Sequence, residues 1–206
     1  MTYIFLHGLG QVPSTWDNVI NDLDDDYDIV CPNLFQLVEN KDINYSHLYD
    51  EFSKYCHKYS KPLNICGLSL GGILALQYAI ENPDYINSLV LIGTQYTMPK
   101  KILRFQNIIF RFLPTHTFNE TGITKKDIIS LTQSMMDLDF HKDLQKINFP
   151  VLIVCGKKDK ANMKASLKLK ELIPCAKLKI IEDAGHEVNE MKPKELAKIL
   201  NEFYKR

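Results

Sequence analysis

Short apolar runs alternate along the chain with longer stretches of helical period, and this alternation constrains the fold more than any other feature. The apolar runs end at glycine or turn residues and predict strands at residues 3–7, 28–31, 63–66, 88–92, 151–155 and 177–181. Helical patterns lie at residues 14–23, 45–59, 70–81, 161–173 and 193–204. Parallel strands joined by helices produce this order. The sequence therefore predicts an α/β protein with a mostly parallel six-stranded sheet flanked by helices.

One segment, residues 94–149, breaks the alternation. It contains no predicted strand, and its amphipathic patterns include KKILRFQNIIFRFL and KKDIISLTQSMM. Insertions of this length between strands are usually functional. We expect a single domain over residues 1–206, with residues 94–149 forming a short helical lid over the carboxyl edge of the sheet.

Composition narrows the classes of partner. The 206 residues are 45% hydrophobic, enough for one domain with one sizeable core, and 25 basic residues balance 25 acidic ones. A neutral chain has no overall field to attract nucleic acid. Five cysteines, an odd number, favour buried thiols over a disulfide framework, and neither an export signal nor a membrane-length apolar run appears. We expect a cytoplasmic protein that binds no nucleic acid and has no membrane span, and composition leaves its oligomeric state open.

The glycines mark one edge of the predicted sheet. All but Gly122 follow a predicted strand or surround Ser69. Ligands of open α/β sheets bind beyond the carboxyl ends of the strands, where close backbone approach favours glycine. This edge is therefore the expected functional site.

Ser69 lies in the stretch CGLSLGG, between a predicted strand and a predicted helix. A G-x-S-x-G match alone is weak, because it arises by chance in roughly one chain in fifteen of this length. The strand-turn-helix context gives it meaning, since the glycines allow a tight turn and the helix points free N–H groups at the serine. The competing interpretation is a serine that only caps the helix. We predict instead that Ser69 is a nucleophile.

A serine hydroxyl needs a base and an orienting acid to attack at neutral pH. His186 follows the last predicted strand in AGHEVNE, and Asp159 follows the fifth in GKKD. Asp183 lies only three residues before His186 and is expected to shape its loop. The predicted catalytic residues are therefore Ser69, Asp159 and His186. Four other histidines are expected to be ordinary surface residues: His47, His57, His116 and His141.

Two backbone N–H groups are needed where negative charge develops on a substrate carbonyl. The stretch HGLG, residues 7–10, follows the first predicted strand and offers one of them. We predict an oxyanion hole made by the N–H groups of Leu9 and Leu70. His7 is expected to support this loop rather than transfer protons. The other supporting residues are Gly8, Gly67 and Gly71.

The motifs HGLG followed by STW, then GLSLGG, GKKD and GHEVNEMKP, resemble those of the α/β-hydrolase superfamily over nearly the whole chain. They are most similar to its small single-domain esterases, lipase-like enzymes and relatives such as pimeloyl-carrier methyl esterases and menaquinone-pathway lyases. The resemblance implies the α/β-hydrolase fold, and the order Ser69, Asp159, His186 is that of the superfamily. Since the HG loop begins at residue 7, the two antiparallel strands that usually precede it are expected to be missing.

The lid sequence suggests an apolar acyl site. Candidate pocket residues are Phe105, Phe112, Met135 and Met136. The alternative is that these side chains only pack the lid against the sheet. A basic helical face of the lid is either solvated or contacts a carboxylate-bearing substrate or an acidic carrier protein; it consists of Lys100, Arg104, Asn107 and Arg111.

Together these features predict a carboxylesterase-like serine hydrolase. Its substrate is expected to be a small-molecule ester with a small or medium, mainly apolar acyl group, cleaved through an acyl-enzyme without a metal or organic cofactor. One alternative uses the same triad for acyl transfer or for a lyase reaction like that of the menaquinone pathway. A second alternative is a non-catalytic ligand receptor on the hydrolase fold.

Overall fold

The structure is a computed structural model that describes residues 1–24, 26–38, 42–98, 100 and 123–205. Within these residues, six strands form one sheet in the order β2-β1-β3-β4-β5-β6, and every neighbouring pair is parallel. The six-stranded parallel sheet predicted from the sequence is thus confirmed. The strands are β1 (Thr2–Leu6), β2 (Asp28–Val30), β3 (Leu63–Leu68), β4 (Ile86–Ile92), β5 (Val151–Gly156) and β6 (Ala176–Ile181).

Apolar side chains cover both faces of the sheet, because successive residues of a strand point to opposite sides. In β1, Ile4 and Leu6 belong to one hydrophobic cluster, whereas Tyr3 and Phe5 belong to the other. All four are less than 9% exposed. A central strand of a parallel sheet is expected to be apolar on both faces in this way.

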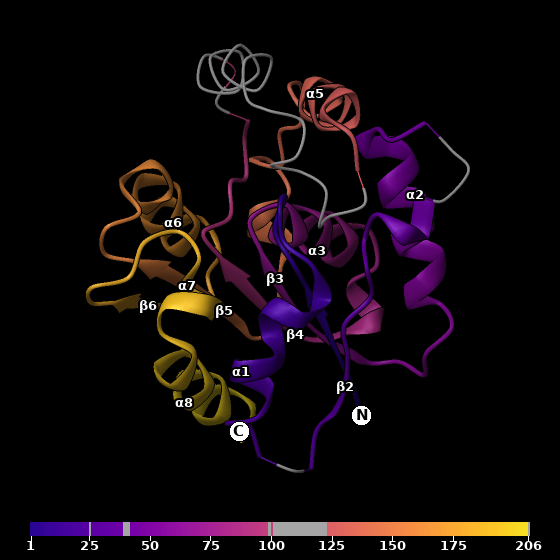
Figure 1. Ribbon diagram of the computed structural model, residues 1–206. Coiled ribbons are helices and arrows are strands. Elements are labelled where there is room, and N and C mark those ends of the chain that lie inside the picture. The colour runs from indigo at the N-terminus through magenta and orange to yellow at the C-terminus, as the bar shows by residue number, and fades with distance from the viewer. Residues whose placement is uncertain (25, 39–41, 99, 101–122, 206) are drawn as a thin grey trace.

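Helices cover both faces of the sheet (Figure 1). The first cluster packs β1 against α2, α3 and α6, and the second packs it against α1, α7 and α8. Although α1 and α8 come from opposite ends of the chain, they lie in contact. The described helices are α1 (Asp17–Ile20), α2 (Tyr45–Cys56), α3 (Leu70–Glu81), α5 (Lys125–Ser134), α6 (Lys160–Leu172), α7 (Val188–Met191) and α8 (Pro193–Tyr204).

Local sequence explains most helix starts. The Asn44 side chain caps α2 by accepting from the His47 N–H, and Pro193 occupies the first turn of α8, where its missing N–H costs nothing. The helix predicted at residues 14–23 is shorter than expected. It consists of a 3₁₀ turn, Pro13–Trp16, followed by the single turn α1.

The predicted lid segment contains α5, which begins at a capping box between Thr124 and Asp127. Its Ile128 and Leu131 are buried in the same hydrophobic cluster as α2 and α3. A single antiparallel bridge joins Thr97 to Asp139. The helical pattern predicted in KKILRFQNIIFRFL lies almost wholly outside the described residues.

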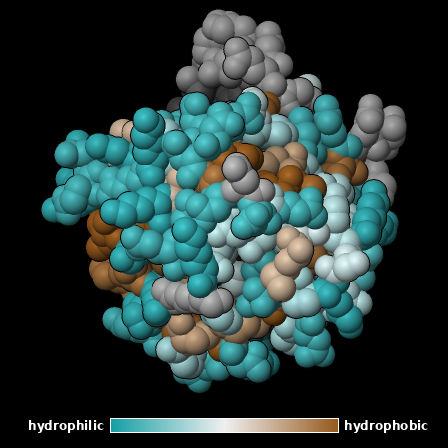
Figure 2. Space-filling view, turned by 90° about the horizontal axis from the view of Figure 1, so that it is seen from below, coloured by the Kyte–Doolittle hydropathy of each residue, from teal (hydrophilic) through white to brown (hydrophobic). Residues whose placement is uncertain are grey.

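The protein surface is mostly polar on the face drawn in Figure 2, where hydrophobic residues form smaller areas between hydrophilic ones. The sheet edge at β2 is only three residues long, and a short edge strand limits pairing with other chains. In the part of the chain that the structure describes, no helix combines the length and the hydropathy needed to cross a bilayer.

Candidate active site

The strand order reverses beside β1. The chain runs from β1 to β2 on one side and then returns to form β3 on the other side of β1. In open parallel sheets, the loops at such a reversal diverge and leave a crevice at the carboxyl ends of the strands. The loop that begins with His7 follows β1, and Ser69 follows β3, so both predicted elements lie at this point.

Ser69 occupies a strained turn between β3 and α3. Its backbone has φ 54° and ψ −111°, a conformation that non-glycine residues rarely adopt and that costs on the order of 1–3 kcal/mol. Ser69 stands at the N-cap position of α3, yet its side chain makes no capping hydrogen bond. Its N–H donates to the Ile92 carbonyl at the end of β4, with 2.9 Å between the atoms. The hydroxyl is therefore not used to start the helix.

Close backbone packing explains the glycines around Ser69. A Cβ added to Gly67 would lie 2.4 Å from the Gly71 carbonyl, and one added to Gly71 would lie 2.5 Å from the Leu6 carbonyl in β1. Side chains at these positions would push α3 away from the sheet. The turn therefore requires glycine on both sides of Ser69, because only glycine leaves room for this backbone packing.

Asp159 and His186 form a hydrogen-bonded pair although they are 27 residues apart. The His186 Nδ1 atom lies 2.8 Å from Asp159 Oδ2. Asp159 is 6% exposed and caps α6 by accepting from the Asn162 N–H, whereas the His186 side chain is 39% exposed. A buried carboxylate beside Nδ1 favours the tautomer with the proton on that atom. The Nε2 lone pair is then left as an acceptor.

Asn162, which the sequence analysis did not single out, completes this pair. Its Nδ2 atom lies 3.0 Å and 2.9 Å from the two Asp159 carboxylate oxygens and 3.1 Å from His186 Nδ1. Burial alone would raise the pKa of Asp159, but hydrogen bonds from His186 and Asn162 outweigh it and hold the pKa of this carboxyl below its ordinary value. Asp159 is thereby kept ionised.

Gly93 brings the pair close to the serine turn. It directly follows Ile92, the residue whose carbonyl binds the Ser69 N–H. A Cβ on Gly93 would lie 2.9 Å from His186 Nδ1 and 3.3 Å from Asp159 Oδ2, and its φ of 54° also favours glycine. Ser69 and His186 therefore pack against two consecutive residues at the end of β4.

His7 lies beneath the loop that follows β1 and is completely buried. Its Nδ1 atom is 2.9 Å from the Gly8 carbonyl, and its Nε2 atom accepts from the Leu34 N–H at 3.1 Å. Since Nε2 accepts, the ring proton is on Nδ1 and donates to Gly8. Burial lowers the pKa of His7, although the hydrogen bond to Gly8 opposes this effect.

The same loop is held by Gln11, a second residue that the sequence analysis did not single out. The Gly8 N–H donates to Gln11 Oε1 at 3.1 Å, and Gln11 Nε2 donates to Asn189 Oδ1 at 3.3 Å. Asn189, in α7, is fully buried. The N–H group of Leu9 follows that of Gly8 in the chain. Among the described residues, neither this group nor the N–H group of Leu70 has a hydrogen-bond acceptor. The N–H groups of Leu9 and Leu70 are thus unpaired within the part of the chain that the structure describes.

A sequence model of the alpha/beta hydrolase fold family matches residues 4–121, more than half of the chain. The chain belongs to this family. The matched residues include the loop at 7–10 and the turn at Ser69 but end before Asp159 and His186. By family, the protein is a hydrolase-fold enzyme, and the resemblance found in its sequence is confirmed.

Individual relatives of this hydrolase-fold protein are distant. Monoacylglycerol lipase abhd6-B of Xenopus laevis is 21% identical, over 97% of this chain and 74% of its own length. A putative 2-succinyl-6-hydroxy-2,4-cyclohexadiene-1-carboxylate synthase of Bacillus subtilis is also 21% identical, over 68% of this chain and 65% of its own. The structure of the esterase EaEST from Exiguobacterium antarcticum aligns with a TM-score of 0.83 at 16% identity, covering 100% of this chain and 92% of that one. The last likeness concerns the fold alone.

None of the described competing residues contacts the Asp159–His186 pair. Asp183 pairs with Lys158 Nζ at 3.0 Å, and both side chains are exposed. His57 and His141 are exposed, and half-buried His47 contacts Asn44, which caps α2, and the Asp42 carbonyl. His116 lies outside the described residues.

The predicted acyl pocket is described only in part. Met135 is 5% exposed and belongs to the hydrophobic cluster between the sheet and its covering helices, and Met136 is half-buried. Phe105 and Phe112 lie outside the described residues, and so do Arg104 and Arg111 of the predicted basic face. The assignment of these side chains to substrate stays a prediction.

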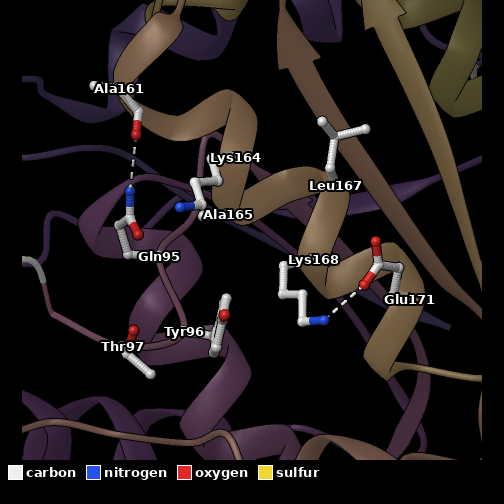
Figure 3. Close-up of a pocket in the computed structure, with 9 residues that line it drawn as sticks. All are labelled: Gln95, Tyr96, Thr97, Ala161, Lys164, Ala165, Leu167, Lys168 and Glu171. Carbon is white, nitrogen blue, oxygen red and sulfur yellow. Dashed lines mark hydrogen bonds and ion pairs between the residues drawn. The ribbon is translucent and has the colours of Figure 1, made fainter.

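A pocket of about 650 Å³ opens between residues 95–97 and α6 (Figure 3). Its described lining contains neither Ser69 nor His186, so it is separate from the serine turn. Gln95 lines it and donates to the Ala161 carbonyl. In the described ranges, no cluster of three or more His, Cys, Asp or Glu residues is placed to hold a metal ion.

Proposed function

We propose that this protein is a serine hydrolase that cleaves a carboxylic ester through an acyl-enzyme. The observation that carries the proposal is the position of Ser69. Its side chain makes no helix-capping hydrogen bond on a strained turn, and that turn packs against the same strand end as the pair of buried Asp159 and partly exposed His186. Strained non-glycine backbone of this kind is concentrated at functional sites.

In the first half of the reaction, Ser69 Oγ attacks the carbonyl carbon of the ester. His186 Nε2 takes the hydroxyl proton as the C–O bond forms, and the Asp159 carboxylate stabilises the imidazolium by accepting from Nδ1. The imidazolium then gives the proton to the departing alkoxide. The alcohol leaves, and the acyl group stays on Ser69.

Negative charge on the former carbonyl oxygen is met by the N–H groups of Leu9 and Leu70. The Gly8 N–H is already bound to Gln11, so the loop offers the Leu9 N–H as its donor. Leu70 is the first residue of α3, where the helix dipole also favours negative charge. His7 supports this loop from below through the Gly8 carbonyl.

In the second half, His186 takes a proton from water, and the resulting hydroxide attacks the acyl carbon. The tetrahedral intermediate collapses, Ser69 receives the proton back from His186, and the carboxylic acid leaves. Each proton that His186 takes is returned within the same half-reaction. The chemistry is complete with this chain's own groups and water.

For the substrate, we propose a small or medium, mainly apolar acyl group under a lid formed by residues 94–149 of a single domain. The distant relative named as a monoacylglycerol lipase supports this class. Buried Met135, in the segment that carries α5, supports an apolar neighbourhood. Each methylene that the pocket buries should then raise kcat/KM by up to a few-fold, since burial of a CH₂ contributes about 0.8 kcal/mol.

The Bacillus subtilis relative supports one alternative, in which the same three residues catalyse a lyase or acyl-transfer reaction. That reading requires a site for a carboxylate-bearing substrate. A non-catalytic receptor is a weaker alternative, because a receptor has no need of an ionised acid paired with a histidine beside a strained serine.

The test is the hydrolysis of p-nitrophenyl esters of graded acyl length by the purified protein and two serine variants. Ser69→Ala should lower kcat by about 10⁶-fold, the loss that follows removal of a triad serine. Ser46→Ala, an exposed residue of α2, is the matched control and should leave kcat unchanged. A Ser69→Ala variant that keeps most of its kcat would rule out the proposal.

A further inference from the structure

The Asn162 side chain lies against both members of the acid-base pair. Its backbone N–H already donates to Asp159 Oδ1 at 3.2 Å, which is the ordinary hydrogen bond of a helix cap. Capping does not require the side-chain amide. Yet its Nδ2 atom also lies within 3.1 Å of both carboxylate oxygens and of His186 Nδ1.

Gln95 fixes which way the Asn162 amide points. The Gln95 Nε2 atom donates to the Ala161 carbonyl at 3.3 Å, and a carbonyl can only accept, so nitrogen rather than oxygen faces α6 here. The same Nε2 atom lies 2.7 Å from Asn162 Oδ1. With its oxygen held by Gln95, Asn162 must present its NH₂ group to Asp159.

These contacts tie together the ends of three neighbouring strands. Gln95 follows β4, Asn162 lies in the first turn of α6 after β5, and His186 follows β6. A carboxylate has about four acceptor sites, and a donor to each oxygen fixes its plane. Asn162 donates to both oxygens of Asp159 and so fixes the carboxylate with Oδ2 facing His186, whose Nδ1 uses a second acceptor site of that oxygen.

We propose that Asn162, oriented by Gln95, is a positioning residue that holds the Asp159 carboxylate, and through it the His186 ring, in the reactive arrangement. The inference rests on the proposed hydrolase mechanism. It adds two residues that touch neither the substrate nor Ser69 and act only through Asp159 and His186.

Asn162→Asp is the decisive variant because it keeps the shape of the side chain and the backbone cap. It replaces the NH₂ donor with an oxygen that faces a buried carboxylate. Since a hydrogen bond to a charged group is worth more than a neutral one, kcat for a p-nitrophenyl ester should fall roughly 100-fold, with KM within about twofold. Asn162→Ala, which removes the donor without adding charge, should lose roughly tenfold.

Gln95→Glu tests the orienting contact from outside the pair. A carboxylate there repels Asn162 Oδ1 and the Ala161 carbonyl, and the Asn162 amide should turn its oxygen toward Asp159. We expect a loss of roughly tenfold in kcat. Asn201→Asp in α8 is the matched control, because Asn201 Nδ2 also donates to a protein oxygen, the Asp22 carbonyl, and kcat should not change.

The experiment measures kcat, KM, the thermal unfolding midpoint and the rate at which a fluorophosphonate labels each folded variant. The proposal is supported if wild type is labelled and if Asn162→Asp and Gln95→Glu both lower kcat and the labelling rate. Their KM and unfolding midpoint should stay those of wild type. If Asn162→Asp keeps kcat within threefold, or if Gln95→Glu is as fast as wild type, the proposal is wrong. If Asn162→Asp does not fold, Gln95→Glu decides alone. Wild type that neither hydrolyses the ester nor is labelled refutes the hydrolase mechanism instead.

Discussion

The serine turn and the Asp159–His186 pair lie at the same sheet edge but are held in opposite ways. At the turn, backbone packs on backbone, and added carbon atoms at Gly67 or Gly71 would lie within 2.5 Å of main-chain oxygens. The pair instead depends on side-chain hydrogen bonds between segments that follow different strands. One half of the site is therefore sensitive to volume, and the other to the number and charge of donors.

This difference predicts how each half fails. At the turn, a substitution that adds one methyl group should lower the stability of the fold. At the pair, a substitution that keeps the shape of the side chain should lower activity and leave the protein folded. Changes that preserve shape are tolerated in a packed region and not in a charged hydrogen-bonded network.

Among the substitutions that compare the turn with the pair, the largest effect is expected at the acid. Asp159→Asn keeps the shape but offers a donor where Nδ1 needs an acceptor, so kcat should fall by about 10⁴-fold, as when a triad aspartate becomes an amide. Asp183→Asn, which loses only an exposed ion pair with Lys158, is the matched control. Steady-state ester hydrolysis measures both. A larger loss for Asp183→Asn than for Asp159→Asn would mean that the wrong carboxylate is assigned.

A smaller effect, on stability, is expected at the turn. In Gly71→Ala the new Cβ meets the Leu6 carbonyl, so the free energy of unfolding should fall by about 3 kcal/mol. Gly10→Ala is the control, because its added Cβ meets no atom within 4 Å and only its φ of 87° is unfavourable, at about 1 kcal/mol. Urea denaturation measures the two. Equal losses would show that packing does not hold the turn.

The smallest effect concerns His7, whose pKa is lowered from its ordinary value of 6.5 by burial. As pH falls below about 6.5, the unfolded chain binds this proton and the folded protein does not. Stability should therefore be lost between that pH and the lower folded pKa, with a slope of at most about 1.4 kcal/mol per pH unit. The pKa of Asp159 is lowered from 3.8, so the stability that its ionised carboxylate contributes is lost only in more acidic solution.

Urea denaturation between pH 7 and pH 5 should show a flatter pH dependence in His7→Gln than in wild type. The comparison of slopes removes the contribution of every other titrating group. Parallel curves would show that His7 titrates alike in the folded and unfolded chains, and that it is not the buried neutral group inferred from its two hydrogen bonds.

Sequence alone predicted the fold well because strand and helix periods are local. The α3 and α8 helices have the predicted bounds, and each strand lies within two residues of its prediction at either end. The helix predicted at 14–23 was too long, since Pro13–Trp16 forms a 3₁₀ turn and α1 ends at Ile20. The α1 helix also packs against α8, a contact that no local pattern predicts.

The candidate site was only partly predictable. The glycines and the order of Ser69, Asp159 and His186 can be recognised from motifs. Asn162 could have been predicted as a capping partner three residues after Asp159, but nothing local indicates its contact with His186. Gln11 and Gln95 bind side chains or loops far away in the sequence, and such amides carry no motif.

The most direct test of the central claim is to locate a fluorophosphonate on the chain by peptide mass spectrometry. The reagent forms a bond with an activated serine, not with a merely exposed one. We predict that wild type carries the label on Ser69 alone and that His186→Ala, at equal folded concentration, is not labelled on the same time scale. Label on another serine, or full-rate labelling of Ser69 without His186, would contradict the account.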